Sequence, residues 1–189
     1  MSDLNSILAE VGISPAQSIE IPGRPPSFLP VSESLNPFVR DRLVSQFPNG
    51  LYSHQANAIE SALEGRDVCL ATTTASGKSA VFAALACHYA LEDPLALTIA
   101  IYPARALVQD QLQKWQEFAT PLRLRVGQID GGIPVSERLE ILQNSQVVVM
   151  TPDVVHAWLL NHVGKTAGEL QRLRMVVLDE GAFNFPLIC

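Results

Sequence analysis

Two separate stretches of this sequence carry side chains suited to phosphate and magnesium chemistry. The first, Thr72 to Ser79, has the sequence TTTASGKS, a run of small residues that ends in Gly-Lys-Ser. Between a strand and a helix, such a loop turns successive backbone N–H groups and a helix N-terminus toward a phosphate chain. Lys78 would contact the β and γ phosphates, and the Ser79 hydroxyl would bind Mg²⁺. The nucleotide-binding residues expected here are Thr73, Thr74, Ala75, Ser76, Gly77, Lys78 and Ser79.

The segments on either side of this loop determine how strongly it indicates nucleotide binding. The GxxxxGKS motif has glycine at its first position, where this chain has Thr72, and the tripeptide Gly-Lys-Ser alone is weak evidence. An apolar strand is expected at residues 67–71, and a helix from about residue 77 places Val81, Leu85 and Tyr89 on one face. A loop between strand and helix is the context that phosphate binding requires, so the pattern favours a nucleotide site.

The second stretch is Val176 to Glu180, where an aliphatic run is followed by two acids. An acid at the end of a buried strand can hold Mg²⁺ through its water shell, and a second acid can orient or deprotonate the attacking water. We therefore expect Asp179 to bind the metal with Ser79, and Glu180 to act in catalysis together with Lys78. A solvated acidic turn at a strand end is the plain alternative.

The composition predicts one globular domain and excludes several classes of protein. The chain has 189 residues, of which 48% are hydrophobic and 17% are charged. It has no run of about 18 apolar residues to cross a membrane, and its first ten residues lack the basic segment of a secretory signal. Its three cysteines, Cys69, Cys87 and Cys189, form no CxxC pair and no zinc-binding spacing. A cytoplasmic protein is expected.

The net charge limits how the chain can bind nucleic acid. Thirteen Lys and Arg residues against nineteen Asp and Glu residues give a net charge of −6, which argues against a broad basic surface that wraps nucleic acid. Binding of a few phosphates at one place is still compatible with this net charge, because helix N-termini and backbone N–H groups can bind phosphates.

Apolar runs and helical stripes alternate along most of the chain, which predicts an α/β fold with a doubly wound, mainly parallel sheet. Strands are expected near residues 67–71, 95–102, 122–129, 146–150 and 174–178. Helices are expected near residues 38–47, 53–64, 77–89, 134–143 and 153–162, and a further helix places Val108, Leu112, Trp115 and Ala119 on one face. The proline-containing residues 1–36 are expected to form an arm ahead of this lobe at residues 37–189. In such sheets, ligands bind at the carboxyl ends of the strands.

Over residues 50–180 the chain resembles the first RecA-like lobe of a superfamily 2 helicase of the DEAD/DEAH-box type. The matching segments are LYSHQ (51–55, Q motif), TTTASGKS (72–79, motif I), YPARAL with QDQ (102–111, motif Ia), DGG (130–132, GG element), TPD (151–153, motif Ib) and VLDE (177–180, motif II). The stretches LYSHQ, TASGKS and ALVQDQ are most similar to helicases that carry a C-terminal zinc-binding cysteine module.

This resemblance implies an ATP- and Mg²⁺-dependent enzyme whose partner is nucleic acid, with DNA and RNA both open. It implies that Gln55 reads the adenine edge. It also implies contacts with the nucleic-acid backbone at Pro103, Arg105, Gly131, Gly132, Thr151, Pro152 and Asp153. Prolines that start helices and an ordinary Gly-Gly turn are the competing structural explanations for several of these residues.

The chain departs from the family pattern after Glu180, where Gly181 and Ala182 follow. The family's Ser-Ala-Thr strand and its second RecA-like lobe have no match here. We therefore expect a lobe that is incomplete at its C-terminus, a fragment of a longer helicase gene, which is inactive as a helicase alone and is completed by a second lobe in the same or another chain. The alternatives are a nucleotide or nucleic-acid binding module without turnover and, less favoured, a P-loop kinase, because no lid segment is evident.

Overall fold

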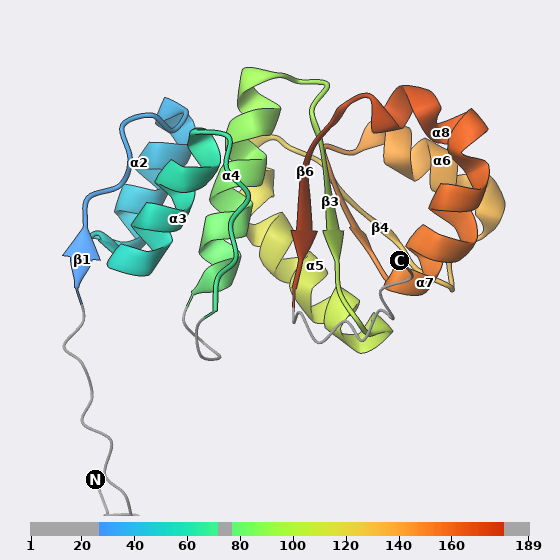
Figure 1. Ribbon diagram of the computed structural model, residues 1–189, viewed down its shortest axis with the longest axis horizontal. Coiled ribbons are helices and arrows are strands. Elements are labelled where there is room, and N and C mark those ends of the chain that lie inside the picture. The colour runs from blue at the N-terminus through green and yellow to red at the C-terminus, as the bar shows by residue number, and fades with distance from the viewer. Residues whose placement is uncertain (1–26, 72–76, 180–189) are drawn as a thin grey trace, which may run out of the picture.

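The computed structural model describes residues 27–71 and 77–179, and a parallel sheet forms its centre (Figure 1). Its four strands are β3 (Leu97–Ile101), β4 (Val126–Ile129), β5 (Val147–Met150) and β6 (Leu173–Leu178), in the order β4-β5-β3-β6. All neighbouring pairs are parallel. Every residue of β5 is buried, as its unbroken apolar sequence predicts for a strand covered on both faces. The predicted α/β class is confirmed.

Helices pack against the sheet in two groups, and most members of each group lie toward one end of the molecule (Figure 1). The first group is α2 (Pro37–Gln46), α3 (Ser53–Leu63), α4 (Lys78–Glu92) and α5 (Arg105–Ala119), and it shares one apolar core with parts of β3, β5 and β6. The second group is α6 (Val135–Asn144), α7 (Pro152–Val154) and α8 (Val163–Leu170), beside a smaller core. No helix in the described ranges is both long and apolar enough to pass through a bilayer.

Residues 27–36 are part of the packed body, although they fall within the predicted arm. The short strand β1 (Phe28–Leu29) pairs with β2 (Leu51–Tyr52) in an antiparallel ladder. Val31 and Leu35 are buried in the larger core. The domain boundary at residue 36 stays a prediction, and residues 1–26 lie outside the described part of the chain.

The predicted strand at residues 67–71 is wrong, because this segment belongs to no strand of the structure. A strand is defined by a hydrogen-bonded neighbour, and none of the described strands pairs with this segment. It lies instead along a cavity whose far side is formed by β6. An apolar run alone does not show whether a neighbour is present to pair with it.

Two other elements differ from the sequence predictions. The strand expected from residue 122 begins at Val126, because residues Thr120–Leu122 form a 3₁₀ turn. The single helix expected near residues 153–162 is divided into α7, a π-helical turn (Val155–Leu159) and a 3₁₀ turn (Leu160–His162), after which the unpredicted α8 follows. A π-helical turn within a helical run often marks a functional region.

Candidate nucleotide and nucleic-acid site

The register of the sheet brings the predicted motifs to one edge. Ile101 lies opposite Met150 on one side and Leu178 on the other, and Ile129 also lies opposite Met150. The residues that follow these four strands are Tyr102, Asp130, Thr151 and Asp179. Segments far apart in the sequence therefore meet at the carboxyl edge, where α/β sheets bind their ligands.

The N-terminus of α4 has the geometry of an anion site. Gly77 is the cap residue and adopts a left-handed conformation with φ 76°, which glycine tolerates without strain. Lys78 and Ser79 are the first residues of the helix. Because glycine offers no side-chain acceptor to the first N–H groups, the helix end is suited to a phosphate from outside.

A cavity of about 1150 Å³ joins this helix end to the strand that carries the metal-binding candidate. Gly77, Lys78 and Ser79 line it from α4, and Asp179 lines it from the end of β6. The backbone N–H of Asp179 donates to the carbonyl of Ile101 at 3.2 Å, which fixes the start of the acidic segment to β3. Predicted residues Thr73, Thr74, Ala75, Ser76 and Glu180 lie outside the described residues.

Gln55 is held by backbone groups on both sides of its amide. Its Oε1 accepts from the N–H of Tyr52 at 2.9 Å, and its Nε2 donates to the carbonyl of Gly77 at 3.0 Å. The residue is only 1% exposed. Gln55 therefore ties the start of α3 to the cap of α4, and its reading of adenine stays a prediction.

Behind the cavity, Tyr102 and Trp115 form a buried polar contact. The indole Nε1–H of Trp115 donates to the Tyr102 hydroxyl at 2.9 Å. Burial, assisted by the negative charge of Asp179 and opposed by the Trp115 hydrogen bond, raises the pKa of the Tyr102 hydroxyl well above its usual value. Tyr102 is therefore a neutral group at physiological pH, and it fixes α5 to the edge of the sheet near Asp179.

These residues fit ATP and Mg²⁺ as a set of donors and ligands. The start of α4 supplies N–H groups and the Lys78 ammonium for phosphate oxygens, while Ser79 and Asp179 supply the oxygen atoms that Mg²⁺ prefers. At about 1150 Å³, the cavity is slightly larger than the usual range of roughly 300–1,000 Å³ for ligand sites, so it is large enough for a nucleotide.

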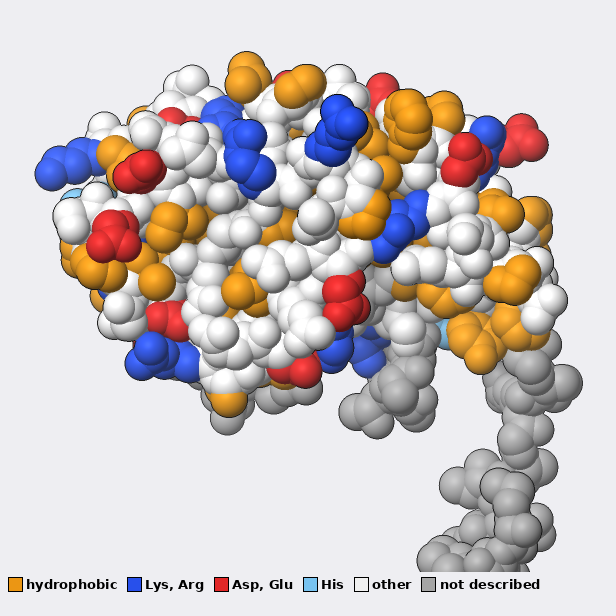
Figure 2. Space-filling model, turned by 180° about the vertical axis from the view of Figure 1, so that it is seen from behind, with side chains coloured by type: hydrophobic (Ala, Val, Ile, Leu, Met, Phe, Trp, Pro, Cys, Tyr) orange, Lys and Arg blue, Asp and Glu red, His pale blue; other side chains and the backbone are white. Residues whose placement is uncertain are grey.

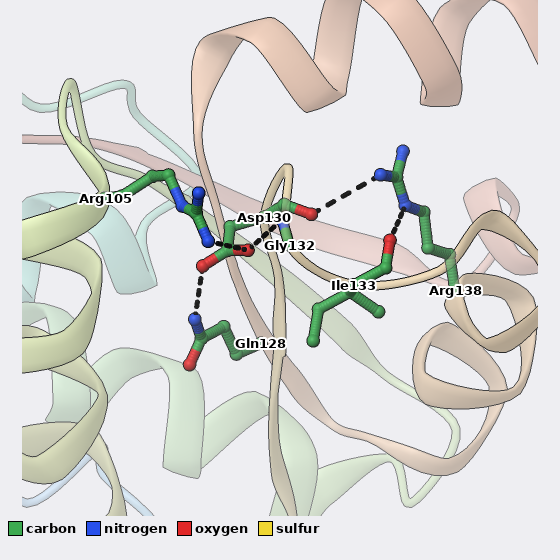
Figure 3. A network of polar contacts seen from close by, with 6 residues as sticks. All are labelled: Arg105, Gln128, Asp130, Gly132, Ile133 and Arg138. Carbon is green, nitrogen blue, oxygen red and sulfur yellow. Dashed lines mark hydrogen bonds and ion pairs between the residues drawn. The ribbon is translucent and has the colours of Figure 1, made fainter.

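Asp130 is the centre of a second network on the same edge (Figure 3). Its Oδ1 accepts from the Gly132 N–H at 2.6 Å and from Arg105 Nη2 at 3.3 Å, and its Oδ2 accepts from Gln128 Nε2 at 2.6 Å. Burial alone would raise the pKa of the Asp130 carboxyl, but these donors together hold it below the usual value. The carboxylate is thus ionised although it is almost fully buried.

Gly132 makes room for Arg105 in this network. A Cβ atom at Gly132 would collide with Arg105 Nη2 and would lie 3.1 Å from Asp130 Oδ1. Gly131 has no atom within 4 Å of such a position. The resemblance implied a contact with the nucleic-acid backbone at both glycines, which stays a prediction, and the structure gives Gly132 a separate reason to lack a side chain.

Arg138 fixes the same turn from the opposite side (Figure 3). Its Nε donates to the carbonyl of Ile133 at 2.9 Å, and its Nη2 lies 3.4 Å from the carbonyl of Asp130. Its guanidinium also lies over the Trp158 ring, 5.8 Å from the centroid. Arg138 therefore links the Gly-Gly turn to the π-helical turn that follows motif Ib.

The remaining candidate residues lie at or shortly before the start of α5 or α7. Thr151 is buried and caps α7, its carbonyl accepts from the N–H groups of Val154 and Val155, and Pro152 is the first residue of the helix as predicted. Asp153 is exposed in that first turn. Pro103 does not start a helix, because α5 begins at Arg105 with Ala104 as its cap residue.

On the face shown in Figure 2, the described Lys and Arg side chains do not form a continuous basic field. They lie in small groups among neutral, apolar and acidic side chains. This agrees with the net charge of −6. Any binding of nucleic acid must therefore depend on a few placed donors rather than on summed charge.

Three residues of the second network were not among the site residues expected from the sequence: Gln128, Asp130 and Arg138. One signal was available for Asp130, since an acid that directly follows a buried strand and precedes Gly-Gly has the donors of a turn close to it. No sequence signal indicated Arg138, because its partners are backbone carbonyls five and eight residues away.

Comparison with known proteins places this fold and site in a family. The model of the DEAD/DEAH box helicase family matches residues 52–181. The chain therefore belongs to the DEAD/DEAH box helicase family, as the motif pattern predicted, and its nucleotide and nucleic-acid candidates fall within the matched segment.

Particular relatives share the same part of the chain. The ATP-dependent helicase HRQ1 of Saccharomyces cerevisiae is 34% identical over 133 residues, 68% of this chain and 12% of that protein. The uncharacterized ATP-dependent helicase YprA of Bacillus subtilis is 25% identical over 163 residues, 85% of this chain and 22% of that protein. The chain thus spans less than a quarter of the length of either relative.

A solved structure supports the fold. The DUF1998 helicase MrfA, in a crystal structure with DNA and AMPPNP bound, matches 94% of this chain with a TM-score of 0.80 and 22% identity, over 26% of the MrfA chain. At this identity the likeness establishes the architecture, and the roles of single residues rest on the geometry described above.

Proposed function

We propose that this chain is the ATP-binding lobe of a nucleic-acid helicase and couples ATP binding and hydrolysis to its hold on a nucleic-acid backbone. The observation that carries the proposal is the single cavity lined by Lys78 and Ser79 from the start of α4 and by Asp179 from the end of β6. A phosphate-binding helix end and a metal-binding acid on a neighbouring strand are the two halves of a P-loop ATPase site.

Each residue would have a separate task in this site. Lys78 and the first N–H groups of α4 would hold the β and γ phosphates, and Ser79 and Asp179 would hold Mg²⁺. The bound metal would supply charge neutralisation on the phosphate oxygens. Glu180 would orient the attacking water, and the loop residues 73–76 would complete the phosphate cradle. Gln55, tied to Gly77, would report occupancy of the base site to the helix end.

Nucleic acid would lie along the same edge of the sheet, next to the turn at Gly131 and Gly132 and the start of α7. Arg105 is an exposed cation at this position, with its side chain 64% exposed, whereas Arg138 is buried against the turn. MrfA is described as bound to DNA, and RNA helicases are also among the relatives, so the proposal covers a backbone of either kind. Unwinding by this chain alone is not expected, because closure on a second lobe supplies the arginine that accelerates turnover.

Calorimetric titration of the 189-residue chain with Mg-ATP tests the proposal. Lys78→Ala should weaken ATP binding at least tenfold, the loss expected for a charge-assisted contact with phosphate of roughly 1.5–3 kcal/mol. Lys165→Ala, the same change at an exposed lysine of α8, is the matched control and should leave the affinity as it is. Equal affinities for wild type and Lys78→Ala would remove the basis of the proposal.

The second candidate is a module that binds nucleotide or nucleic acid without turnover. The observation that favours it is that Lys78, Ser79 and Asp179, which line the cavity, are suited to holding nucleotide and metal by themselves. It predicts ATP binding without phosphate release, and steady turnover by the isolated chain that rises on addition of nucleic acid would exclude it.

A further inference from the structure

The geometry points to Asp130 as a positioning residue: we propose that its buried carboxylate holds the Arg105 guanidinium in place for one phosphate of a nucleic-acid backbone. The inference rests on the proposed function and extends it to a residue that is not itself in contact with the ligand. It makes a prediction whose sign is opposite to that of simple electrostatics.

The two carboxylate oxygens of Asp130 accept hydrogen bonds from different partners. Its Oδ2 accepts from Gln128 and so fixes the rotation of the carboxylate, while its Oδ1 accepts from both Gly132 and Arg105. A charged acceptor with three donors is strongly oriented. The guanidinium of Arg105 is therefore aligned by an acceptor that cannot itself turn.

Arg105 remains accessible despite this contact. One of its nitrogens, Nη2, lies against Asp130, whereas the side chain as a whole is 64% exposed. A guanidinium carries five N–H donors in a planar fork, so most of them remain for a second acceptor. The N–H of Gly132 is already donated to Asp130. Arg105, the first residue of α5, thus presents free donors outward beside this turn.

The turn itself does not depend on the carboxylate alone. Arg138 holds the carbonyls of Asp130 and Ile133, and the N–H of Ile133 donates back to the carbonyl of Asp130 at 3.1 Å. Removing the charge from the Asp130 side chain should leave this backbone in place. The substitution should instead weaken the contact that orients the Arg105 side chain. A more mobile arginine loses more conformational entropy when it binds phosphate, so binding should be weaker.

The net charge of the site and the positioning of Arg105 predict opposite effects of Asp130→Asn on the affinity for nucleic acid. The substitution removes a negative charge 3.3 Å from Arg105 and makes the site more positive, so binding through charge alone would become tighter. If Asp130 positions Arg105, binding should instead become roughly fivefold to tenfold weaker. The dependence of log K on log salt should fall by about 0.7, the value for one single-strand phosphate contact.

The test is fluorescence anisotropy of labelled oligothymidylate and oligouridylate with the 189-residue chain, at several salt concentrations. Four proteins are compared: wild type, Asp130→Asn, Arg105→Ala and the double variant. Because Asp130 acts through Arg105, the two single substitutions should lower affinity and salt slope alike, and the double variant should match Arg105→Ala. If Asp130→Asn weakened binding only by disturbing the structure, its loss of binding free energy would add to that of Arg105→Ala in the double variant. Thermal melting confirms that each variant is folded.

Asp93→Asn is the matched control. Asp93 also accepts from a backbone N–H two residues ahead, at Leu95, and from an arginine Nη2 at 3.3 Å, at Arg174, but it lies away from the Gly-Gly turn. Its substitution should leave binding of both oligonucleotides unchanged. Tighter or unchanged binding by Asp130→Asn would overturn the positioning role of Asp130 and leave the proposed function standing. So would a double variant whose loss of binding free energy is the sum of the two single losses. Absence of salt-dependent binding by the wild type would overturn the proposed nucleic-acid function together with the positioning role.

Discussion

At the scale of single residues, two glycines with positive φ allow the effect of backbone strain at the start of α4 to be separated from the effect of side-chain contacts there. Gly77 has φ 76° and Gly65 has φ 80°. A Cβ atom at Gly77 would collide with Gln55 Nε2, whereas at Gly65 it would meet nothing within 4 Å. The two positions therefore share a backbone conformation and differ in what surrounds them.

We expect Gly65→Ala to lower the free energy of unfolding by about 1 kcal/mol, the usual penalty of a left-handed alanine. Gly77→Ala should lower it by about 2 kcal/mol or more, because the Gln55 amide must also leave the Gly77 carbonyl. Urea denaturation of both variants gives the comparison. Equal losses would show that the Gln55 contact contributes nothing to the fold.

The residues of the two networks differ in how far the sequence could predict them. Lys78 and Asp179 could be chosen as candidates from the sequence, because a Gly-Lys-Ser loop ahead of a helix and an acid after an aliphatic run are local patterns. The contact between Asp130 and Arg105 could not be predicted, because it joins positions 25 residues apart and depends on the register of two strands that are not adjacent. Both residues are in matched motifs, but no motif indicates that one holds the other.

At the scale of elements, a histidine connects α4 to the start of α2. The N–H of Asn36 donates to His88 Nδ1 at 3.0 Å, and the Asn36 side chain caps α2 at Phe38 N and donates to Glu92 Oε1. Nδ1 must be unprotonated to accept this bond, so His88 is neutral here. Burial lowers the pKa of His88, and the charge of Glu92 only partly opposes this effect.

This contact predicts a loss of stability on acidification. Because the pKa of His88 is lower in the folded state than in the unfolded chain, the unfolded state binds more protons as the pH falls through the unfolded value of about 6.5. The contribution is complete above that value and is lost below it. Unfolding free energies between about pH 8 and about pH 5.5 should therefore fall for the wild type.

His88→Asn keeps an acceptor near the position of Nδ1 and removes the titration, so its stability should fall less steeply over the same interval. His156→Asn, at an exposed histidine, is the control and should leave the slope of the wild type unchanged. If His88→Asn and wild type had the same slope, the α2–α4 contact would not be the source of the pH dependence.

Elements with strong local patterns were predicted within a few residues, and elements defined by their neighbours were not. The buried strand β5 and helix α4 follow directly from their apolar pattern. The ladder of β1 and β2 was missed, because two-residue strands carry no periodicity. The segment 67–71 was called a strand on its composition alone, although pairing depends on a neighbour elsewhere in the chain.

At the scale of the whole molecule, the cavity that holds Lys78 and Asp179 continues along an open edge of the sheet. β6 pairs with β3 on one side, and no described strand pairs with its other side. Apolar side chains from residues 68 and 70 and from α4 line the cavity opposite β6. An edge strand with unpaired N–H and C=O groups beside an apolar groove is a template for association with another chain.

We therefore expect the 189-residue chain to self-associate through β6, and Val176→Lys to reduce this association. Val176 lies in the middle of β6 and is 50% exposed, so a lysine there should be tolerated by the fold and should disfavour pairing of the edge. Val44, on α2, is 51% exposed and provides the matched control. Sedimentation velocity over a range of concentrations should show about tenfold weaker association for Val176→Lys and no change for Val44→Lys, since only the first places charge on a strand edge. Equal effects of the two substitutions would show that added charge, rather than the open edge of β6, controls association.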